Sequence, residues 1–181
     1  MGPDPVDPLE AILAELAEVA AVIDRERMAR LVDVMRAAKR IFVAGIGRSG
    51  LMARALAMRL MHLEFEVYVV GETTTPSIAR GDLLVCCSRY GKSRTLHTYV
   101  EKAHEVGAKA VLVTMTARSP LARRVDEVFV IPVEEGGTSR QPLGTIFEQG
   151  LLLYCDALVM IAMKRLGVSE QVMARRHTQL E

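Results

Sequence analysis

The sequence predicts an α/β protein, a three-layer α-β-α sandwich with a five-stranded parallel sheet. Three observations predict this fold. Short apolar runs alternate with helical segments along the chain, which is typical of parallel βαβ units. These runs are continuously apolar, as expected for strands covered on both faces. The chain has 181 residues, half of them hydrophobic, so we expect residues 1–181 to form a single domain with one core.

The amino-terminal residues 1–38 are expected to form two helices. The first begins near Pro8, after Asp7, and its apolar residues recur at helical spacing as far as Ile23. The second is expected from Asp24 to Ala38, with its apolar residues on one face.

The rest of the chain alternates between strands and helices. Strands are expected at Ile41–Ala44, Val67–Val70, Leu83–Cys87, Ala110–Thr114 and Glu127–Ile131. Helices are expected at Ser49–Leu63, Ser93–Val106, Leu121–Arg124 and Thr145–Leu166, the third of them short and started by Ser119-Pro120. Residues 134–142 contain two adjacent glycines and are expected to form a loop, whereas the charged tail, residues 168–181, is expected to be helical in part.

Composition and charge exclude several classes of function. The formal net charge is +1 and there is no Trp, so we expect no nucleic-acid partner. The amino end is acidic and rich in proline, unlike a signal peptide, and no apolar run reaches about 18 residues, so we expect no membrane partner. The three cysteines show no pairing pattern and are interpreted as buried thiols in the reducing cytoplasm. No spacing of His, Cys and carboxylate residues indicates a metal site, and we expect no cofactor.

Two glycine-rich turns carry the main indication of function. Residues 41–50 read IFVAGIGRSG, and residues 88–95, after the third strand, read SRYGKSRT. In a parallel sheet both turns lie at the carboxyl edge, where each opens a helix whose amino end attracts anions. We therefore predict a pocket for a phosphorylated sugar. Its predicted residues are Gly47, Arg48 and Ser49 of the first turn, Ser88, Arg89, Gly91 and Ser93 of the second, and Thr73 of the loop after the second strand.

Other interpretations of these turns stay open on the residues alone. Gly45, Gly47 and Gly50 match the GxGxxG pattern of dinucleotide-binding proteins, or they serve only to make a tight turn. Gly91-Lys92-Ser93 resembles the end of a Walker A loop. However, Cys86 stands where that motif has its first glycine, and the fourth strand lacks a terminal Asp to hold magnesium.

A longer stretch resembles a known family. The segment GIGRSGLMARALAMRLMHLEFEVYVVGETTTPSIARGDLL, residues 45–84, resembles the 6-phospho-3-hexuloisomerases, members of the sugar isomerase (SIS) domain superfamily. QPLGTIFEQ at residues 141–149 and HTQLE at residues 177–181 extend the likeness over nearly the whole chain.

The resemblance implies a flavodoxin-like SIS domain that interconverts D-arabino-hex-3-ulose 6-phosphate and D-fructose 6-phosphate through a cis-enediol. This reaction follows formaldehyde fixation in the ribulose monophosphate pathway. The resemblance also implies a homotetramer with active sites at subunit boundaries, in which the tail, residues 168–181, reaches a neighbouring subunit.

The second turn departs from the family pattern, which usually reads SGSGET. Here the same positions read SRYGKS, so Arg89 replaces a glycine, Tyr90 a serine and Lys92 a glutamate. Arg89 could attract the phosphate by its charge, or it could fill the pocket and change the substrate.

Glu148 and His177 are the candidate catalytic residues, carried over from the resemblance. Moving a carbonyl from C3 to C2 needs a base that removes the C2 proton and returns it at C3, and a carboxylate can do this. Glu148 is the candidate base, but Thr145-Ile146-Phe147-Glu148 also matches a capping box in which Glu148 only bonds the helix start. His177 would open a cyclic sugar or relay a proton, or it is a solvated residue on a frayed end. Arg48 would neutralise phosphate or pair with a carboxylate across a subunit boundary.

Two rival functions remain on the sequence alone. One is a non-catalytic module that binds a phosphosugar as a sensor. The other is an isomerase of a different phosphosugar, such as a pentose 5-phosphate.

Overall fold

The computed structural model describes residues 7–133 and 139–179. Five parallel strands form one sheet in the order β2-β1-β3-β4-β5. Their bounds are Ile41–Gly45 for β1, Val67–Val69 for β2, Leu83–Cys87 for β3, Lys109–Thr114 for β4 and Glu127–Val130 for β5. The predicted α/β class and five-stranded parallel sheet are confirmed, and each predicted strand lies within one residue of its observed bounds.

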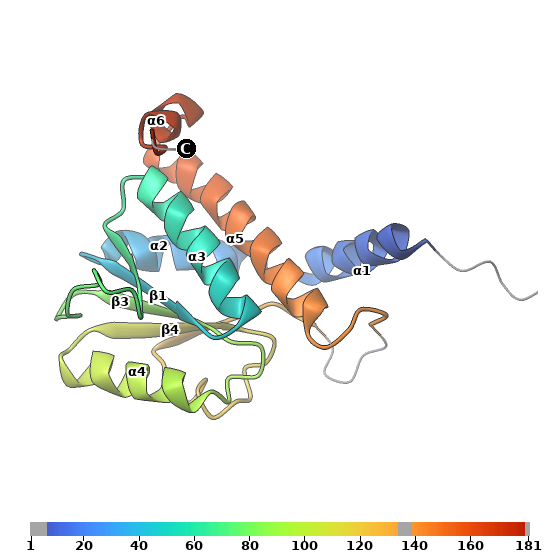
Figure 1. The fold of residues 1–181 in the computed structure, drawn as a ribbon, viewed down its shortest axis with the longest axis horizontal. Coiled ribbons are helices and arrows are strands. Elements are labelled where there is room, and N and C mark those ends of the chain that lie inside the picture. Colours follow the sequence, from blue (N-terminus) through green and yellow to red (C-terminus); the bar gives the residue numbers. More distant parts are fainter. Residues whose placement is uncertain (1–6, 134–138, 180–181) are drawn as a thin grey trace, which may run out of the picture.

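Helices cover both faces of the sheet. Their bounds are Pro8–Val22 for α1, Arg25–Ala37 for α2, Arg48–His62 for α3, Arg94–Glu105 for α4, Thr145–Leu166 for α5 and Glu170–Arg175 for α6. In Figure 1, α2, α3 and α5 lie on one side of the sheet and α4 on the other, while α1 extends away from the body of the fold.

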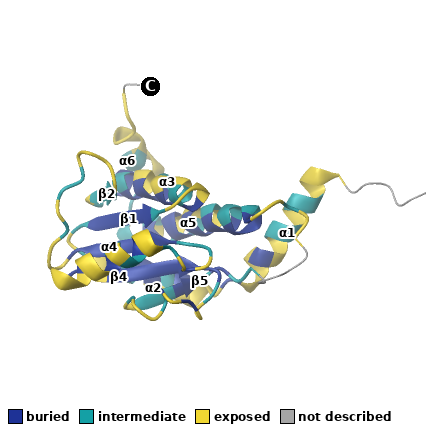
Figure 2. Ribbon diagram, turned by 60° about the horizontal axis from the view of Figure 1, so that its bottom comes forward, coloured by how far each residue is buried: buried dark blue, intermediate teal, exposed yellow. Residues whose placement is uncertain are grey.

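Successive residues of a strand point to opposite faces of the sheet, so alternate residues contribute to two separate cores. Val43, Val85 and Val113 belong to the core under α2, α3 and α5. Ala44, Cys86 and Leu112, their neighbours in sequence, belong to the core under α4. The three central strands β1, β3 and β4 are therefore buried on both sides, which explains their continuously apolar sequences, whereas the edge strands β2 and β5 are mostly half-buried (Figure 2).

Four of the six helices in the described residues begin with a side-chain N-cap. Asp7 accepts hydrogen bonds from the first backbone amides of α1, and Asp24, Ser93 and Ser169 do the same for α2, α4 and α6. At the other end of α5, Gly167 adopts a left-handed conformation with φ of 66°, which stops that helix. The two helices that lack a side-chain cap, α3 and α5, both begin at the candidate site described below.

One predicted helix is wrong. Residues 121–124 form turns and no α-helix, because the amide of Leu121 bonds the carbonyl of Gly91 at 3.1 Å and so ties this segment to the second glycine turn. Ser119 caps the turn by accepting from the amide of Ala122 at 3.0 Å. Of the predicted loop at residues 134–142, residues 134–138 lie outside the described part of the chain.

The long helix α5 is apolar over most of its length, as the sequence indicates. Among the described residues it is the one helix long and apolar enough to cross a membrane by length and composition, with a mean hydropathy of 1.6 over its best window. Half of that window is buried inside the fold, where α1, α2 and α3 pack against it. A core position therefore accounts for its composition.

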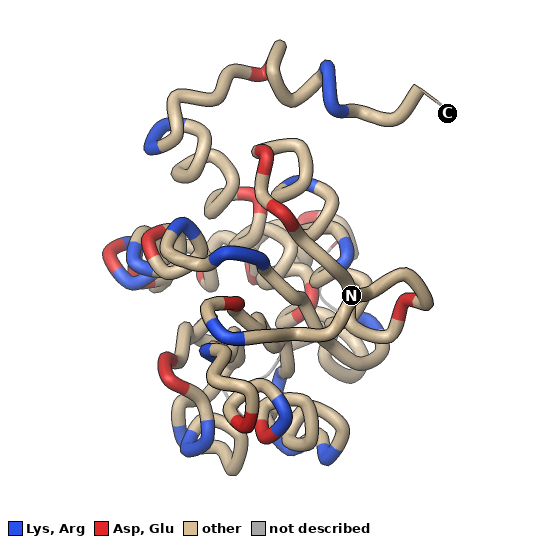
Figure 3. Tube along the Cα trace, turned by 90° about the vertical axis from the view of Figure 1, so that its left-hand side faces the viewer, with Lys and Arg blue, Asp and Glu red and all other residues tan. Residues whose placement is uncertain are grey.

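Charged residues of both signs are mixed along the chain. Figure 3 shows basic and acidic positions alternating over the face in view, so that face carries no single-sign surface.

At the edge opposite the glycine turns, Asp82 is 2% exposed and accepts two hydrogen bonds from Arg40, at 2.6 and 3.1 Å. This pair joins the chain just before β1 to the start of β3.

Candidate functional site

The candidate site lies at the carboxyl edge of the two central strands. β1 and β3 are paired in register from Ile41 with Leu83 to Gly45 with Cys87, so the two glycine turns leave the sheet side by side. The chain departs from β1 toward β2 on one side, and β3 leads to β4 on the other. This reversal of strand order is where parallel α/β sheets bind their ligands.

Close backbone contact explains two glycines of the first turn. A Cβ on Gly45 would lie 2.8 Å from the Cα of Gly50, and one on Gly50 would lie 2.6 Å from the carbonyl oxygen of Gly45. The end of β1 therefore touches the first turn of α3, which no larger residue would permit. Gly47, at the helix start, has a φ of 60°, a conformation that favours glycine.

Arg48 and Glu148 meet across this edge. The Nε of Arg48, in the first turn of α3, donates to the Oε2 of Glu148, in the first turn of α5, at 2.9 Å. The carboxylate side chain is 15% exposed and the guanidinium side chain 57%, so the acid is sheltered and the cation faces outward. Arg48 thus has a carboxylate partner within its own chain, and its predicted pairing across a subunit boundary stays a prediction.

The capping-box interpretation of Glu148 is also wrong. Gly144 is the N-cap of α5 and makes no side-chain hydrogen bond, while the hydroxyl of Thr145 donates to the carbonyl of Pro142 at 2.7 Å. Glu148 points instead to Arg48, so its carboxylate is directed toward the start of α3.

The start of α3 places backbone amides beside this ion pair. This helix has no side-chain cap, and the first amides of a helix have no partner within the helix. At the start of α3, Ser49 is 7% exposed and Arg48 carries a positive charge. This arrangement of amides, hydroxyl and cation suits a phosphate group.

The second turn presents its serines in local hydrogen bonds. Ser88 Oγ accepts from the amide of Gly91 at 3.2 Å, and Ser93 Oγ accepts from the amide of Leu96 at 3.4 Å. A hydroxyl that accepts in this way retains its proton as a donor for a phosphate oxygen. Gly91 has a φ of 57°, and a Cβ there would lie 2.2 Å from Ser119 Oγ, so only glycine fits.

His177 is not brought to Glu148 within one chain, whereas Thr73 follows β2 at the same carboxyl edge of the sheet. Thr73 is exposed in the loop after β2, which an ion pair between Glu72 and Arg54 holds beside α3. His177 stacks on His62, with ring centroids 5.4 Å apart. Because Arg48 and His62 are the first and last residues of α3, about 21 Å of helix separates the histidine pair from Arg48.

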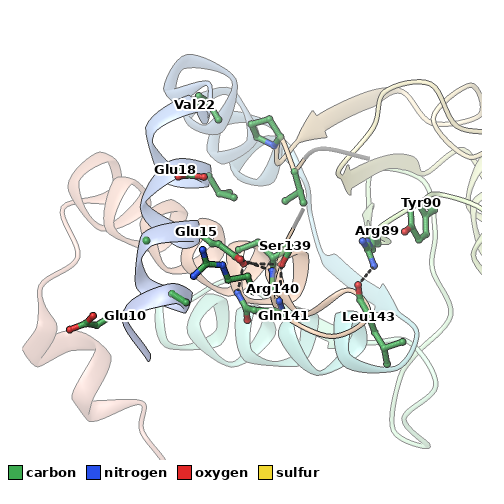
Figure 4. Close-up of a pocket in the computed structure, with 16 residues that line it drawn as sticks. Glu10, Glu15, Glu18, Val22, Arg89, Tyr90, Ser139, Arg140, Gln141 and Leu143 are labelled. Carbon is green, nitrogen blue, oxygen red and sulfur yellow. Dashed lines mark hydrogen bonds between the residues drawn. The ribbon is translucent and has the colours of Figure 1, made fainter. Parts of the chain in front are cut away.

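Two contacts that frame the site were not predicted from the sequence. Arg89 Nη1 donates to the carbonyl of Leu143 at 2.8 Å, just before α5. Glu15 of α1 accepts from Ser139 Oγ, the Arg140 amide and the Gln141 side chain at 2.8, 2.7 and 3.0 Å. A cavity of about 890 Å³ opens between these contacts, walled by α1 on one side and by Arg89 on the other (Figure 4). Both contacts join residues more than 50 positions apart, which local spacing does not reveal.

Comparison with known proteins gives consistent results. A family model described as SIS domain matches residues 34–155. A Bacillus subtilis (strain 168) protein named 3-hexulose-6-phosphate isomerase is 36% identical, over 94% of this chain and 95% of its own. A Mycobacterium gastri protein of the same name is 37% identical, over 100% of this chain and 94% of its own. A solved Methanococcus jannaschii structure, from which a function of 3-hexulose-6-phosphate isomerase was inferred, superposes with a TM-score of 0.85 at 32% identity, covering 96% of this chain and 98% of that one.

Proposed function

The chain belongs to the SIS domain family and, within it, to the group of the 3-hexulose-6-phosphate isomerases, and on this premise we propose that it interconverts D-arabino-hex-3-ulose 6-phosphate and D-fructose 6-phosphate. The observation that carries the proposal is the sheltered Glu148 carboxylate, held 2.9 Å from Arg48 where two uncapped helices begin. A base and an anion-binding surface thus lie together at the ligand edge of the sheet. We place the reaction in the cytoplasm, within formaldehyde assimilation through ribulose monophosphate.

Glu148 moves the proton. Its carboxylate removes the C2 proton of the 3-ulose, and the C2–H electron pair forms the C2–C3 double bond of a cis-enediolate whose negative charge lies on the C3 oxygen. The proton of the C2 hydroxyl passes to the C3 oxygen, and the carboxylic acid then returns its own proton to C3 as the C2 oxygen becomes the carbonyl. One acid therefore serves both half-reactions, and no electron acceptor is needed. Arg48 donates to this carboxylate at 2.9 Å and so holds it toward the start of α3 at the beginning of the cycle.

The phosphate of the substrate binds between the two glycine turns. Backbone amides at Gly47, Arg48 and Ser49 supply donors on one side. The hydroxyls of Ser88 and Ser93 supply donors on the other, with the Gly91 amide of the same turn, and Thr73 contacts a sugar hydroxyl from the loop after β2. Because Arg48 is more than half exposed, its guanidinium also neutralises the dianion.

A homo-oligomer, which we take to be a tetramer, completes the site. Leu51 and Met58 of α3 are 57% and 44% exposed, and Leu153 and Met160 of α5 are 45% and 63% exposed. Each pair is seven residues apart, so it lies on one helix face, and α3 packs against α5. These four side chains therefore form one apolar surface that a second copy of the chain would bury. In that assembly the tail, residues 168–181, brings His177 to a neighbour's site, where it opens the ring or relays a proton.

Substitution of the base tests the proposal. Proton transfer by a positioned side chain contributes roughly 10²- to 10⁴-fold, so Glu148→Gln is expected to lower kcat by about that factor while fructose 6-phosphate still binds. Exchange of the C2 and C3 hydrogens with D₂O, followed by NMR, reports the proton transfer directly. Glu26→Gln is the matched control, because Glu26 is an exposed acid in the first turn of α2 and should change nothing. A wild-type chain that binds fructose 6-phosphate without hydrogen exchange would instead be a sensor, and a panel of phosphosugars would reveal a different substrate.

A further inference from the structure

Arg89 connects the second glycine turn to the start of α5. Its guanidinium Nη1 donates to the carbonyl oxygen of Leu143 at 2.8 Å, and the dashed line in Figure 4 marks this bond. Leu143 lies two residues before Thr145, the first residue of α5. The bond therefore joins the loop after β3 to the helix that carries Glu148.

The backbone of Arg89 is fixed independently of its side chain. Its carbonyl oxygen accepts from Thr114 Oγ1 at 2.8 Å and from the amide of Met115 at 3.2 Å. Thr114 is fully buried and is the last residue of β4. The backbone of Arg89 is thus fixed to the end of β4, so the position of its side chain is set relative to the sheet.

The side chain is restrained as well. The guanidinium carbon lies 4.6 Å from the centre of the Tyr90 ring, a cation–π distance. Arg89 Nε is buried and has no hydrogen-bond partner among the described residues, so the bond to Leu143 is the guanidinium's anchor there. Ring stacking and this single bond together select one position of the long side chain.

The turn before α5 is shaped to receive Arg89. Leu143 has a φ of 57°, which is uncommon for a residue other than glycine, and its side chain is 96% exposed. Its strained backbone directs the carbonyl to the guanidinium, while its side chain contributes little. Gly144 has a φ of −117°, which any residue adopts, yet a Cβ there would lie 2.6 Å from Arg89 Nη1. A larger residue at position 144 would therefore displace the Arg89 guanidinium from the space it occupies.

The same turn sets the first turn of α5. The carbonyl of Gly144 accepts from the amides of Phe147 and Glu148 at 3.0 and 3.3 Å, and no side chain caps this helix. We propose that Arg89 is a positioning residue for Glu148: by holding the Leu143–Gly144 turn, it fixes the backbone from which the catalytic carboxylate projects toward Arg48. The proposal rests on the isomerase function above for its catalytic half. It assigns a role to the arginine that departs from the family's SGSGET pattern.

Kinetics distinguish positioning from direct phosphate binding. Arg89→Met removes the guanidinium and keeps most of the aliphatic part of the side chain. We expect kcat to fall tenfold or more, because small misplacements of a catalytic group are costly. KM for fructose 6-phosphate should change less than twofold. Arg89→Lys retains a donor and should restore part of kcat. Arg118→Met, at an exposed arginine of the loop after β4, is the matched control and should leave both constants unchanged. A rise in KM with unchanged kcat would make Arg89 a phosphate ligand and overturn the proposal.

Gly144 offers a second test that depends on the same contact. Gly144→Ala should displace the flexible guanidinium and lower kcat about as much as Arg89→Gly does. In the Arg89→Gly background the added methyl meets no guanidinium, so the double variant should be no slower than Arg89→Gly alone. If the reductions in kcat multiply in the double variant, the two residues act independently, and this would contradict the proposal.

Hydrogen exchange separates this inference from the proposed function. The amides of Phe147 and Glu148 should exchange faster in Arg89→Met than in the wild type, and not in Arg118→Met. If the wild type lacks isomerase activity but this difference appears, the proposed function fails and the holding of the α5 turn by Arg89 stands. If the wild type is active and neither exchange nor kcat responds to Arg89→Met, the inference fails and the function stands.

Discussion

His62 and His177 stack ring on ring, with centroids 5.4 Å apart, at the end of α3 that lies farthest from Arg48. His62 is 2% exposed, so the stack anchors the tail on the body of the same chain. Within that chain His177 is too far from Glu148 to share a proton with it. A catalytic role for His177 therefore requires the site of another subunit.

Mixing of two inactive variants tests this role. We expect Glu148→Gln and His177→Ala each to reduce turnover when prepared alone. Chains unfolded together in equal amounts and refolded should regain about a quarter of the wild-type activity, because half of the two-fold interfaces become mixed and one of the two sites at each is intact. Isomerase assays before and after mixing make the measurement. Recovery absent from the mixture would confine His177 to a structural role on His62.

The buried Asp82–Arg40 pair should contribute to stability and not to catalysis. It lies at the edge of the sheet opposite the glycine turns, and Asp82 also accepts from the amide of Ala79 at 2.8 Å. Asp82→Ala leaves these donors without their acceptor, so the free energy of unfolding should fall by about 3 kcal/mol, measured in urea. Below the unfolding transition kcat should be unchanged. Glu101→Ala, which removes an exposed ion pair with Arg124, should alter neither quantity appreciably.

The attachment of α1 through Glu15 should weaken in acid. The backbone hydrogen bond from Arg140 and the side-chain bond from Gln141 lower the pKa of Glu15 below its ordinary value of 4.5. Since the folded pKa is lower than the unfolded one, the contribution of the ionised carboxylate is complete above about pH 4.5 and is lost as the pH falls through the folded pKa. Urea unfolding at pH 6 and at pH 3 should therefore show a smaller pH dependence in Glu15→Gln than in the wild type. Glu18→Gln, on the same helix, is the control and should retain the wild-type dependence.

The three thiols should be unreactive in the folded protein. Cys86, Cys87 and Cys155 are all buried and free, and burial raises the pKa of each thiol, that of Cys87 to about 12. Because the thiolate is the reactive form, a disulfide reagent at pH 8 should label none of them until urea unfolds the chain, and then all three. Rapid labelling of the native protein would contradict the burial of these residues.

The sequence predicted most of the fold because its local features mark the ends of elements. Asp7, Asp24 and Ser93 cap helices where expected, and Gly107 follows the end of α4. Where prediction failed, a distant contact overrode a local pattern. The segment after Ser119-Pro120 bonds Gly91 instead of continuing into a helix.

The site was predicted less completely for the same reason. The two glycine turns and Glu148 belong to continuous motifs, and they come together as expected. The acid's partner is Arg48, 100 residues away, which no spacing around Glu148 indicates, and so the capping box was an equal candidate from sequence alone. The bond from Arg89 to Leu143 joins residues 54 positions apart, so local sequence spacing could not predict it.

The missing Cβ at Gly144 also couples the residues that positions 89 and 144 can carry together. A methyl at 144 would lie 2.6 Å from Arg89 Nη1, so the guanidinium keeps its bond to Leu143 without displacement beside a glycine. A side chain introduced at 144 would move the guanidinium and disturb the start of α5, so the residue chosen at one of the two positions constrains the residue at the other.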